Sequence, residues 1–421
     1  MKFKMSRNIT DHRRSRFKSL GLYLGSAVVA ASTALYAQPA TGSVEKLEKE
    51  NQDLRKRLDA LESAAQKAGT MPSGGMQSLK ALSDSTISGF VSASYFYDSS
   101  APKDGVSNGY LWSRDHNSFT LNKVKITLEK PVETSGDKWD AGYRASLIFG
   151  QDAQFVNTGG ELQGLETLRE AFVNVNVPVG TGLNVKAGQL ISLLNFESGD
   201  GGVANPNFSQ GNQWFFTGNG PSTGVQLGYN LTEKVDFKVR VQNGLFTGVK
   251  DGNGFKTLMG SLGLKPDDKT SISLIGFGGR EGTDNSLWLK GGSLIASRQL
   301  VEKCNLNIAT ELDYFSADQV KGSKDWWSIG GWIWTDFTPK AGLAFRGDYI
   351  NDGDGAGTSG LLGFPVNTGM DLYSLTLTLN LRPTPALKIQ PEIRYEHTTL
   401  NGGFDGDESR VIAGIGASYA F

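Results

Sequence analysis

From residue 86 to the end of the chain, apolar and polar residues alternate with a period of two. In residues 373–382 the apolar positions are Tyr373, Leu375, Leu377, Leu379 and Leu381, and the polar ones between them are Ser374, Thr376, Thr378, Asn380 and Arg382. Successive side chains of a β-strand point to opposite faces, so this pattern predicts strands with one apolar face and one polar face.

About sixteen segments of this kind follow one another. They cover residues 86–97, 118–130, 138–150, 166–177, 182–192, 221–231, 234–245, 256–265, 269–280, 286–300, 303–316, 325–337, 340–350, 370–382, 386–399 and 408–421. An even number of strands of this length is typical of a barrel that spans a membrane.

The links between these segments alternate in length. Tight links at 178–182, 232–234, 266–269, 301–303 and 338–340 alternate with longer loops rich in Gly, Asn and Asp, at 98–117, 151–165, 193–220 and 351–369. Short turns at one rim and long loops at the other are typical of outer-membrane barrels, whereas a soluble β-sandwich needs no such asymmetry. We therefore predict an all-β fold, a transmembrane antiparallel β-barrel of about 16 strands over residues 86–421, with a soluble β-repeat protein as the alternative.

The first 37 residues have the pattern of a secretory signal peptide. Four basic residues at positions 13–18 precede an apolar stretch from Leu20 to about Leu35, and Ala37 is the expected residue before cleavage. Cleavage after Ala34 or Ala40, a twin-arginine signal and an uncleaved anchor remain alternatives. No other segment of the sequence approaches the length of a membrane-spanning helix.

Residues 44–66 carry a heptad pattern. Positions a and d of a coiled coil would be filled by Val44, Leu47, Asn51, Leu54, Leu58 and Leu61. Opposite charges at the flanking positions favour parallel association of identical chains, and a lone amphipathic helix or a contact with another envelope component are the alternatives. Residues 67–85 would form a flexible linker.

The last segment alternates up to Tyr419 and ends on Phe421. A terminal aromatic residue after an alternating strand resembles the signal that outer-membrane barrels present to their assembly machinery. We expect Tyr419 and Phe421 to act as this assembly signal, with the barrel assembly machinery and outer-membrane lipid as partners.

Several blocks of the sequence resemble the OmpL-like outer-membrane β-barrel porin family of Gram-negative-type bacteria. They are residues 87–90 (ISGF), 121–131 (LNKVKITLEKP), 149–153 (FGQDA), 168–178 (LREAFVNVNVP) and 205–209 (NPNFS). The resemblance spans roughly residues 85–421. It implies a porin without naming a substrate, and a homotrimer follows by analogy with other porins.

The polar faces of the predicted strands carry charges of both signs. The residues that we expect to line the lumen are Lys123, Lys125, Arg144, Glu170, Lys186, Lys238, Arg240, Glu311, Asp313, Arg346, Asp348, Glu392 and Arg394. Strong ion selectivity would need rings of one sign, so the charges either wet the lumen or set up a transverse field at a constriction. The loop 193–220 either folds inward and narrows the pore or caps the extracellular rim.

Composition excludes several other classes of protein. The chain has 421 residues, of which 54 are Gly and one is Cys, and its 42 basic and 43 acidic residues leave a formal net charge of −1. One Cys excludes a disulfide framework, and a balanced charge does not predict nucleic-acid binding. The three His residues lie far apart and no catalytic pattern surrounds them, so we expect no enzyme, metal or cofactor.

Together these features predict an outer-membrane porin, a water-filled channel for passive diffusion of ions and small hydrophilic solutes. The alternative is a structural or adhesive outer-membrane protein that its coiled coil tethers to the periplasm.

Overall fold

The computed structural model describes residues 84–155, 167–245, 247, 251–282, 287–319, 322–357, 362–365 and 367–421, together with residues 49, 52, 53, 56, 57 and 60. None of the described helical segments is long and apolar enough to cross a membrane. The predicted signal peptide, the coiled-coil seam residues and the linker up to residue 83 lie outside the described residues.

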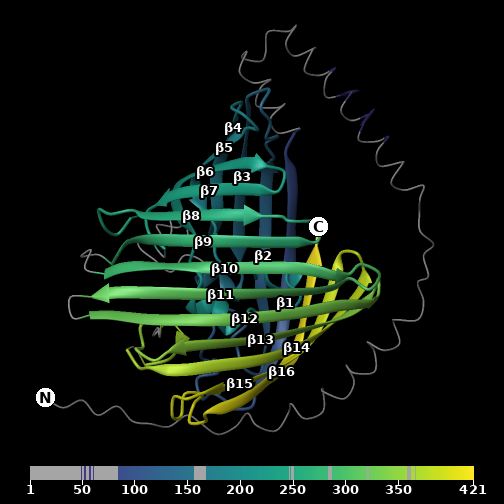
Figure 1. Ribbon diagram of the computed structural model, residues 1–421. Helices are drawn as coiled ribbons and strands as arrows, with labels where there is room; N and C mark the ends of the chain where they lie inside the picture. The colour runs from purple at the N-terminus through teal and green to yellow at the C-terminus, as the bar shows by residue number, and fades with distance from the viewer. Residues whose placement is uncertain are drawn as a thin grey trace, which may run out of the picture. The chain divides into compact units, whose positions relative to one another are not determined.

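Sixteen antiparallel strands form one closed barrel (Figure 1), in which each strand pairs with its neighbours in the chain and β1 pairs with β16. The strands are β1 (Thr86–Asp98), β2 (Ser118–Lys130), β3 (Asp140–Phe149), β4 (Leu168–Val177), β5 (Leu183–Leu190), β6 (Ser222–Thr232), β7 (Val235–Gln242), β8 (Thr257–Leu264), β9 (Thr270–Glu281), β10 (Leu287–Val301), β11 (Leu306–Gln319), β12 (Gly322–Thr338), β13 (Ala341–Asp352), β14 (Met370–Thr384), β15 (Leu387–Thr398) and β16 (Ser409–Ala420). The predicted all-β antiparallel barrel of sixteen strands is confirmed, whereas the coiled-coil helix expected before it stays a prediction. Closure pairs the edges of the sheet, which could not stay unpaired in hydrocarbon.

The alternation in the sequence sets the two faces of the wall. In β14, Leu375 and Leu377 are exposed on the outer surface, whereas the neighbouring Thr376 and Thr378 are fully buried inside the barrel. The outer face therefore presents apolar side chains to the membrane, and polar side chains face inward.

The two rims differ as predicted. Seven short links, of two to nine residues, join strands at the rim that we call the short-turn rim, where β1 begins and β16 ends. The other links, among them residues 99–117, 191–221 and 353–369, lie at the long-loop rim. β11 begins at Leu306 and not at residue 303, because Asn305 takes up a left-handed conformation (φ 47°) that completes the preceding turn.

Bulges near the long-loop ends of β2 and β4 add a residue to each strand that the alternation does not reveal. In β2 the pairing with β1 shifts between Lys123 and Leu121, and in β4 the pairing with β3 shifts between Glu170 and Leu168. Such a bulge breaks the period of two, so that two consecutive side chains turn to the same face. Arg169 and Glu170 are accordingly both buried.

The interior also contains an apolar cluster. Met259, Phe277, Phe315 and Trp326, from the inward faces of β8, β9, β11 and β12, pack with Leu194 from the loop that follows β5. The sequence pattern predicts charged side chains on the inward face of the wall. The structure shows that this face also carries an apolar region. Side chains of this size fill part of the barrel interior and exclude water there.

Of the N-terminal segment, Lys49, Gln52, Asp53, Lys56, Arg57 and Ala60 are helical and exposed. Arg57 forms an exposed ion pair of 3.0 Å with Asp53 one turn earlier. These residues occupy positions outside the predicted seam, and parallel association stays a prediction.

Candidate pore and its inward segment

The thirteen predicted lumen residues lie on the inward face of the barrel wall, opposite the exposed apolar side chains. They fall into two groups. Arg144, Lys186 and Lys238 are partly exposed inside the barrel, and the other ten are buried. Their role in lining a pore stays a prediction, but their contacts explain the difference between the groups.

Residues 191–221, which we call the inward segment, connect β5 to β6 and fold inside the barrel. The segment contains the short helices η2 (Gly201–Val203) and α4 (Asn212–Phe216). η2 contacts β15 and β16, and α4 contacts β12, β13 and β14. Of the two conformations that the sequence left open for this loop, the structure therefore has the inward one.

A buried ion pair holds the middle of the inward segment. Nη1 of Arg346 on β13 donates to Oε1 of Glu197 at 2.7 Å, and both side chains are buried. Arg346 also donates to the carbonyl oxygen of Ser209, and the other oxygen of Glu197 accepts from the backbone N–H of Gly211 at 2.7 Å. Both charges are thus paired and hydrogen-bonded, as burial of charge requires.

Glu392 on β15 anchors the next part of the segment. Its carboxylate accepts from the backbone N–H of Phe208 at 2.8 Å and from the backbone N–H of Ser209 at 3.3 Å. Nearby, the ammonium group of Lys388 donates to the carbonyl oxygens of Gly202 and Asn205, both at 2.7 Å. The wall therefore supplies charged partners to backbone groups that would otherwise be buried without them.

Arginines of β15 and β16 extend this network to the loop 99–117. Arg394 donates to the side chain of Asn212 at 2.7 Å, and Arg410 pairs with Asp98 at 3.1 Å and with Glu396 at 2.7 Å. The ring of Tyr110 lies 4.2 Å from the guanidinium of Arg394. Burial raises the pKa of the Tyr110 phenol well above its ordinary value, despite these cations.

Acidic residues of β11 hold both ends of the segment. Glu311 accepts from the backbone N–H of Phe196 at 2.8 Å, and Asp313 accepts from the side chains of Gln213 and Thr217, both at 2.7 Å. The carboxylates of Glu311 and Asp313, which the sequence predicts to line the lumen, therefore accept hydrogen bonds from the inward segment.

On the opposite side, β2 contributes two lysines. Lys125 forms an ion pair with Asp200 of the inward segment at 2.8 Å, and Lys123 forms one with Asp152 at 2.9 Å. Burial would raise the pKa of the Asp200 carboxyl, but the Lys125 ammonium and the Arg169 guanidinium hold it below its ordinary value. Asp200 is thus a stable anionic anchor at neutral pH.

From the end of β2 to β7, the inward segment covers less of the wall than it does at β11 to β16. Arg144 bridges Glu129 and Glu170, each at 2.7 Å, and these side chains, apart from Glu170, stay about one-third exposed. Lys238 pairs with Asp236 at 2.9 Å and is 40% exposed. Lys186 lies 4.9 Å from the ring of Phe172. In this stretch Arg144, Lys186 and Lys238 keep the most exposure among the thirteen predicted lumen residues, whereas Arg240 is buried and donates to the carbonyl oxygen of Ile191.

The partners contributed by the inward segment could not be found from sequence. Glu197 and Arg346 are separated by 149 residues, and Asn212 and Glu396 by 184. Neither separation carries a local signal, since loop residues have no period that predicts their orientation. The bulged Arg169 was missed because the alternation points it outward.

Within the described ranges, no group of three or more His, Cys, Asp or Glu side chains could hold a metal ion. At the C-terminus, the backbone groups of Phe421 exchange two hydrogen bonds, of 2.9 and 3.0 Å, with Gly89 of β1. The role of Tyr419 and Phe421 as an assembly signal stays a prediction.

Comparison with known proteins agrees with this geometry. The family model described as "Putative beta-barrel porin-2, OmpL-like" matches residues 84–421. No curated protein matches the chain significantly. The resemblance stated from the sequence blocks is therefore confirmed by the family match.

Solved porin structures share the fold. An anion-selective porin from Comamonas acidovorans aligns with a TM-score of 0.52 and 11% identity, over 80% of this chain and 99% of that chain. The outer membrane channel DcaP of Acinetobacter baumannii aligns with a TM-score of 0.51 and 14% identity, over 80% and 97%. The trimer form of OmpT, an outer membrane protein of Vibrio cholerae, aligns with a TM-score of 0.51 and 11% identity, over 80% and 99%. The chain belongs to the OmpL-like β-barrel porin family, and its barrel resides in the outer membrane of a Gram-negative bacterium.

Proposed function

We propose that the barrel is a constricted porin through which ions and small hydrophilic solutes diffuse passively. The observation that carries this proposal is the unequal covering of the interior wall. The inward segment covers the faces of β11 to β16, whereas Arg144, Lys186 and Lys238 on β3, β5 and β7 remain partly exposed. A barrel of sixteen strands is wide enough to keep an aqueous path beside such a segment.

In this proposal the predicted lumen residues divide into two roles. Arg144, Lys186 and Lys238 line the path together with Glu170, which pairs with Arg144, and the remaining members, including Arg240 through its bond to the carbonyl oxygen of Ile191, hold the loops in place. The inward segment then forms the constriction, and by the usual orientation of these barrels it enters from the extracellular side.

The charges along the path predict weak selectivity. Three cations (Arg144, Lys186 and Lys238), with the buried Arg240 beside them, stand against three anions (Glu129, Glu170 and Asp236) on this wall. A strong preference needs a ring of one sign. We propose a small preference for anions, which the fold shared with an anion-selective porin supports without deciding it.

Planar-bilayer recording on the purified full chain tests the proposal. Discrete conductance steps in KCl and a small reversal potential under a KCl gradient are the expected result. Folded protein that inserts without producing steps would contradict it.

We also propose that the chain assembles as a homotrimer. A trimer form among the structures that share its fold, and the heptad pattern of residues 44–66, support this assembly. Light scattering of the detergent-solubilised protein, corrected for bound detergent, measures the protein mass directly. A trimer predicts conductance steps in groups of three, and a monomeric mass would contradict the assembly without affecting the channel.

A further inference from the structure

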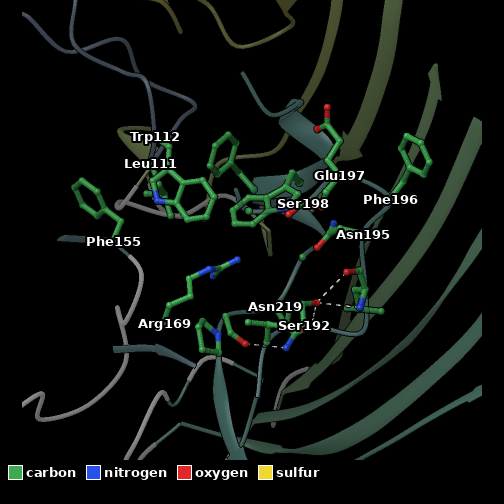
Figure 2. A pocket seen from close by; sticks show the side chains of 18 residues that line it. Leu111, Trp112, Phe155, Arg169, Ser192, Asn195, Phe196, Glu197, Ser198 and Asn219 are labelled. Atoms are coloured by element: carbon green, nitrogen blue, oxygen red, sulfur yellow. Dashed lines mark hydrogen bonds between the residues drawn. The ribbon is translucent and has the colours of Figure 1, made fainter. Parts of the chain in front are cut away.

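At the long-loop end of β4 and β5, a cavity of about 300 Å³ lies between the wall, the inward segment and the loop 99–117 (Figure 2). Its size is at the lower end of the range of roughly 300–1,000 Å³ for pockets that hold one small ligand. Aromatic side chains form much of its lining, contributed by Trp112, Phe155, Trp214 and Phe215.

The guanidinium of Arg169 points into this cavity, between Trp112 and the side formed by Ser192 and Asn219 (Figure 2). Arg169 is only 7% exposed. Among the described residues its guanidinium has no hydrogen bond or ion pair, and its Cζ atom lies 5.9 Å from the centre of the Trp112 ring. A buried guanidinium carries five donors, and leaving them unpaired is costly.

Three other buried arginines of the barrel pair with carboxylates, and the buried Arg240 donates to Gln226 and to the carbonyl oxygen of Ile191. Arg346 pairs with Glu197, Arg394 with Glu396, and Arg410 with Asp98 and Glu396. The acids of the inward segment nearest to Arg169 are already occupied, because Asp200 pairs with Lys125 and Glu197 with Arg346. Arg169 therefore interacts with Asp200 only at longer range, and among the described residues no carboxylate forms a hydrogen bond with its guanidinium.

Two further polar atoms at the cavity lack partners. The indole Nε1 of Trp112 and the amide Oδ1 of Asn195 are buried and have no hydrogen-bond partner within the described part of the chain. The guanidinium of Arg169 suits an anionic oxygen, because its N–H groups can form charge-assisted hydrogen bonds with it. The aromatic lining suits an apolar body attached to that anion.

We propose that this cavity is a binding subsite for a small aromatic monocarboxylate, whose carboxylate pairs with Arg169 and whose ring packs against the aromatic lining. One free guanidinium matches one carboxylate, and the volume admits a single ring. This subsite rests on the proposed porin function, because it names a solute class for the same channel. Bound there, the solute lies beside the constriction.

Benzoate is the probe, with benzamide as its uncharged counterpart of the same shape. Binding is measured by titration calorimetry on the purified full chain in detergent, independently of conductance. We expect saturable benzoate binding to the wild type, and binding of benzamide weaker by about 10- to 100-fold, the value of a charge-assisted hydrogen bond. Equal affinity for the two probes, or no saturable benzoate binding, would overturn the subsite.

Arg169→Gln removes the charge and is expected to weaken benzoate binding by a similar factor. Arg298→Gln is the matched control, because Arg298 is exposed at the short-turn rim and pairs with Asp267 at 3.0 Å, away from the cavity. Heat-modifiable migration in electrophoresis shows whether each variant is folded. If Arg169→Gln does not fold, the affinities of the wild type for benzoate and benzamide alone decide whether the cavity is a carboxylate subsite.

The two proposals fail separately. A protein that binds benzoate through Arg169 but never conducts KCl would retain the subsite and refute the porin function. A protein that conducts KCl but binds benzoate no better than benzamide would retain the porin function and refute the subsite.

Discussion

Arg346 and Glu197 form a fully buried ion pair of 2.7 Å between the barrel wall and the inward segment. Glu197 also accepts from the indole Nε1 of Trp332 at 3.2 Å, so that two neighbouring strands hold the same carboxylate. The pair is therefore one of the buried anchors that hold the segment across the barrel, and its removal provides a direct test of the constriction.

Arg346→Met should release the inward segment. Removal of one partner from a buried ion pair leaves the other charge uncompensated, which costs about 3–5 kcal/mol. We expect a larger single-channel conductance with more open-channel noise. Arg382→Met is the matched control, since Arg382 pairs with Asp336 in a partly exposed position without contact to the segment. Unchanged conductance and noise in Arg346→Met would contradict the assignment of the segment as the constriction.

Neutralising the uncovered wall should alter selectivity. The triple variant Arg144→Gln, Lys186→Gln, Lys238→Gln removes the three cations that we place along the path. We expect the reversal potential under a KCl gradient to move toward that of a cation-selective channel, because Glu129 and Asp236 then dominate the local field. Arg298→Gln, on the outer surface, should leave the reversal potential unchanged. A reversal potential that does not move in the triple variant would place the path elsewhere.

Asp200 should anchor the segment over a wide range of pH. The Lys125 ammonium holds the pKa of its carboxyl below the ordinary value, so this group stabilises the fold above its unfolded pKa of about 3.9, and that stability is lost as the pH falls through the lower, folded pKa. Asp200→Asn should therefore differ from the wild type by a constant amount between pH 7 and about pH 5. The difference should vanish only in more acidic solution.

Urea unfolding of both proteins across this range, followed by tryptophan fluorescence, measures the difference directly. A difference that disappears between pH 7 and pH 5 would show that the carboxyl titrates in that range and is not held by Lys125.

Gly416 should be sensitive to the smallest substitution. A Cβ atom there would lie 2.1 Å from the ring of Phe208, so Gly416→Ala forces the inward segment away from β16. Overpacking of this kind costs about 1–3 kcal/mol. Gly276→Ala is the matched control, because a Cβ at Gly276 meets nothing within 4 Å. Chemical unfolding should show a loss for Gly416→Ala alone, and equal stability of the two variants would contradict the close packing of Phe208.

The architecture of the wall was predictable from the sequence because it depends on local chemistry. Leu375 and Leu377 face outward and Thr376 inward for a reason contained in the chain itself, which is that a strand has a period of two and its two faces meet different solvents. The same period located the strands, and the alternating link lengths separated the two rims.

The constriction and the cavity were decided only by the tertiary structure. Glu197 pairs with Arg346, and Asp200 pairs with Lys125, because closure of the barrel brings distant strands around one interior. The spacing of these residues in the sequence does not predict either pair. Arg169 turns inward because a bulge in β4 shifts its pairing with β3. The alternation of the sequence would place this side chain on the outer face. Periodicity is a property of a single strand, whereas the filling of the barrel depends on which loop the completed wall can hold.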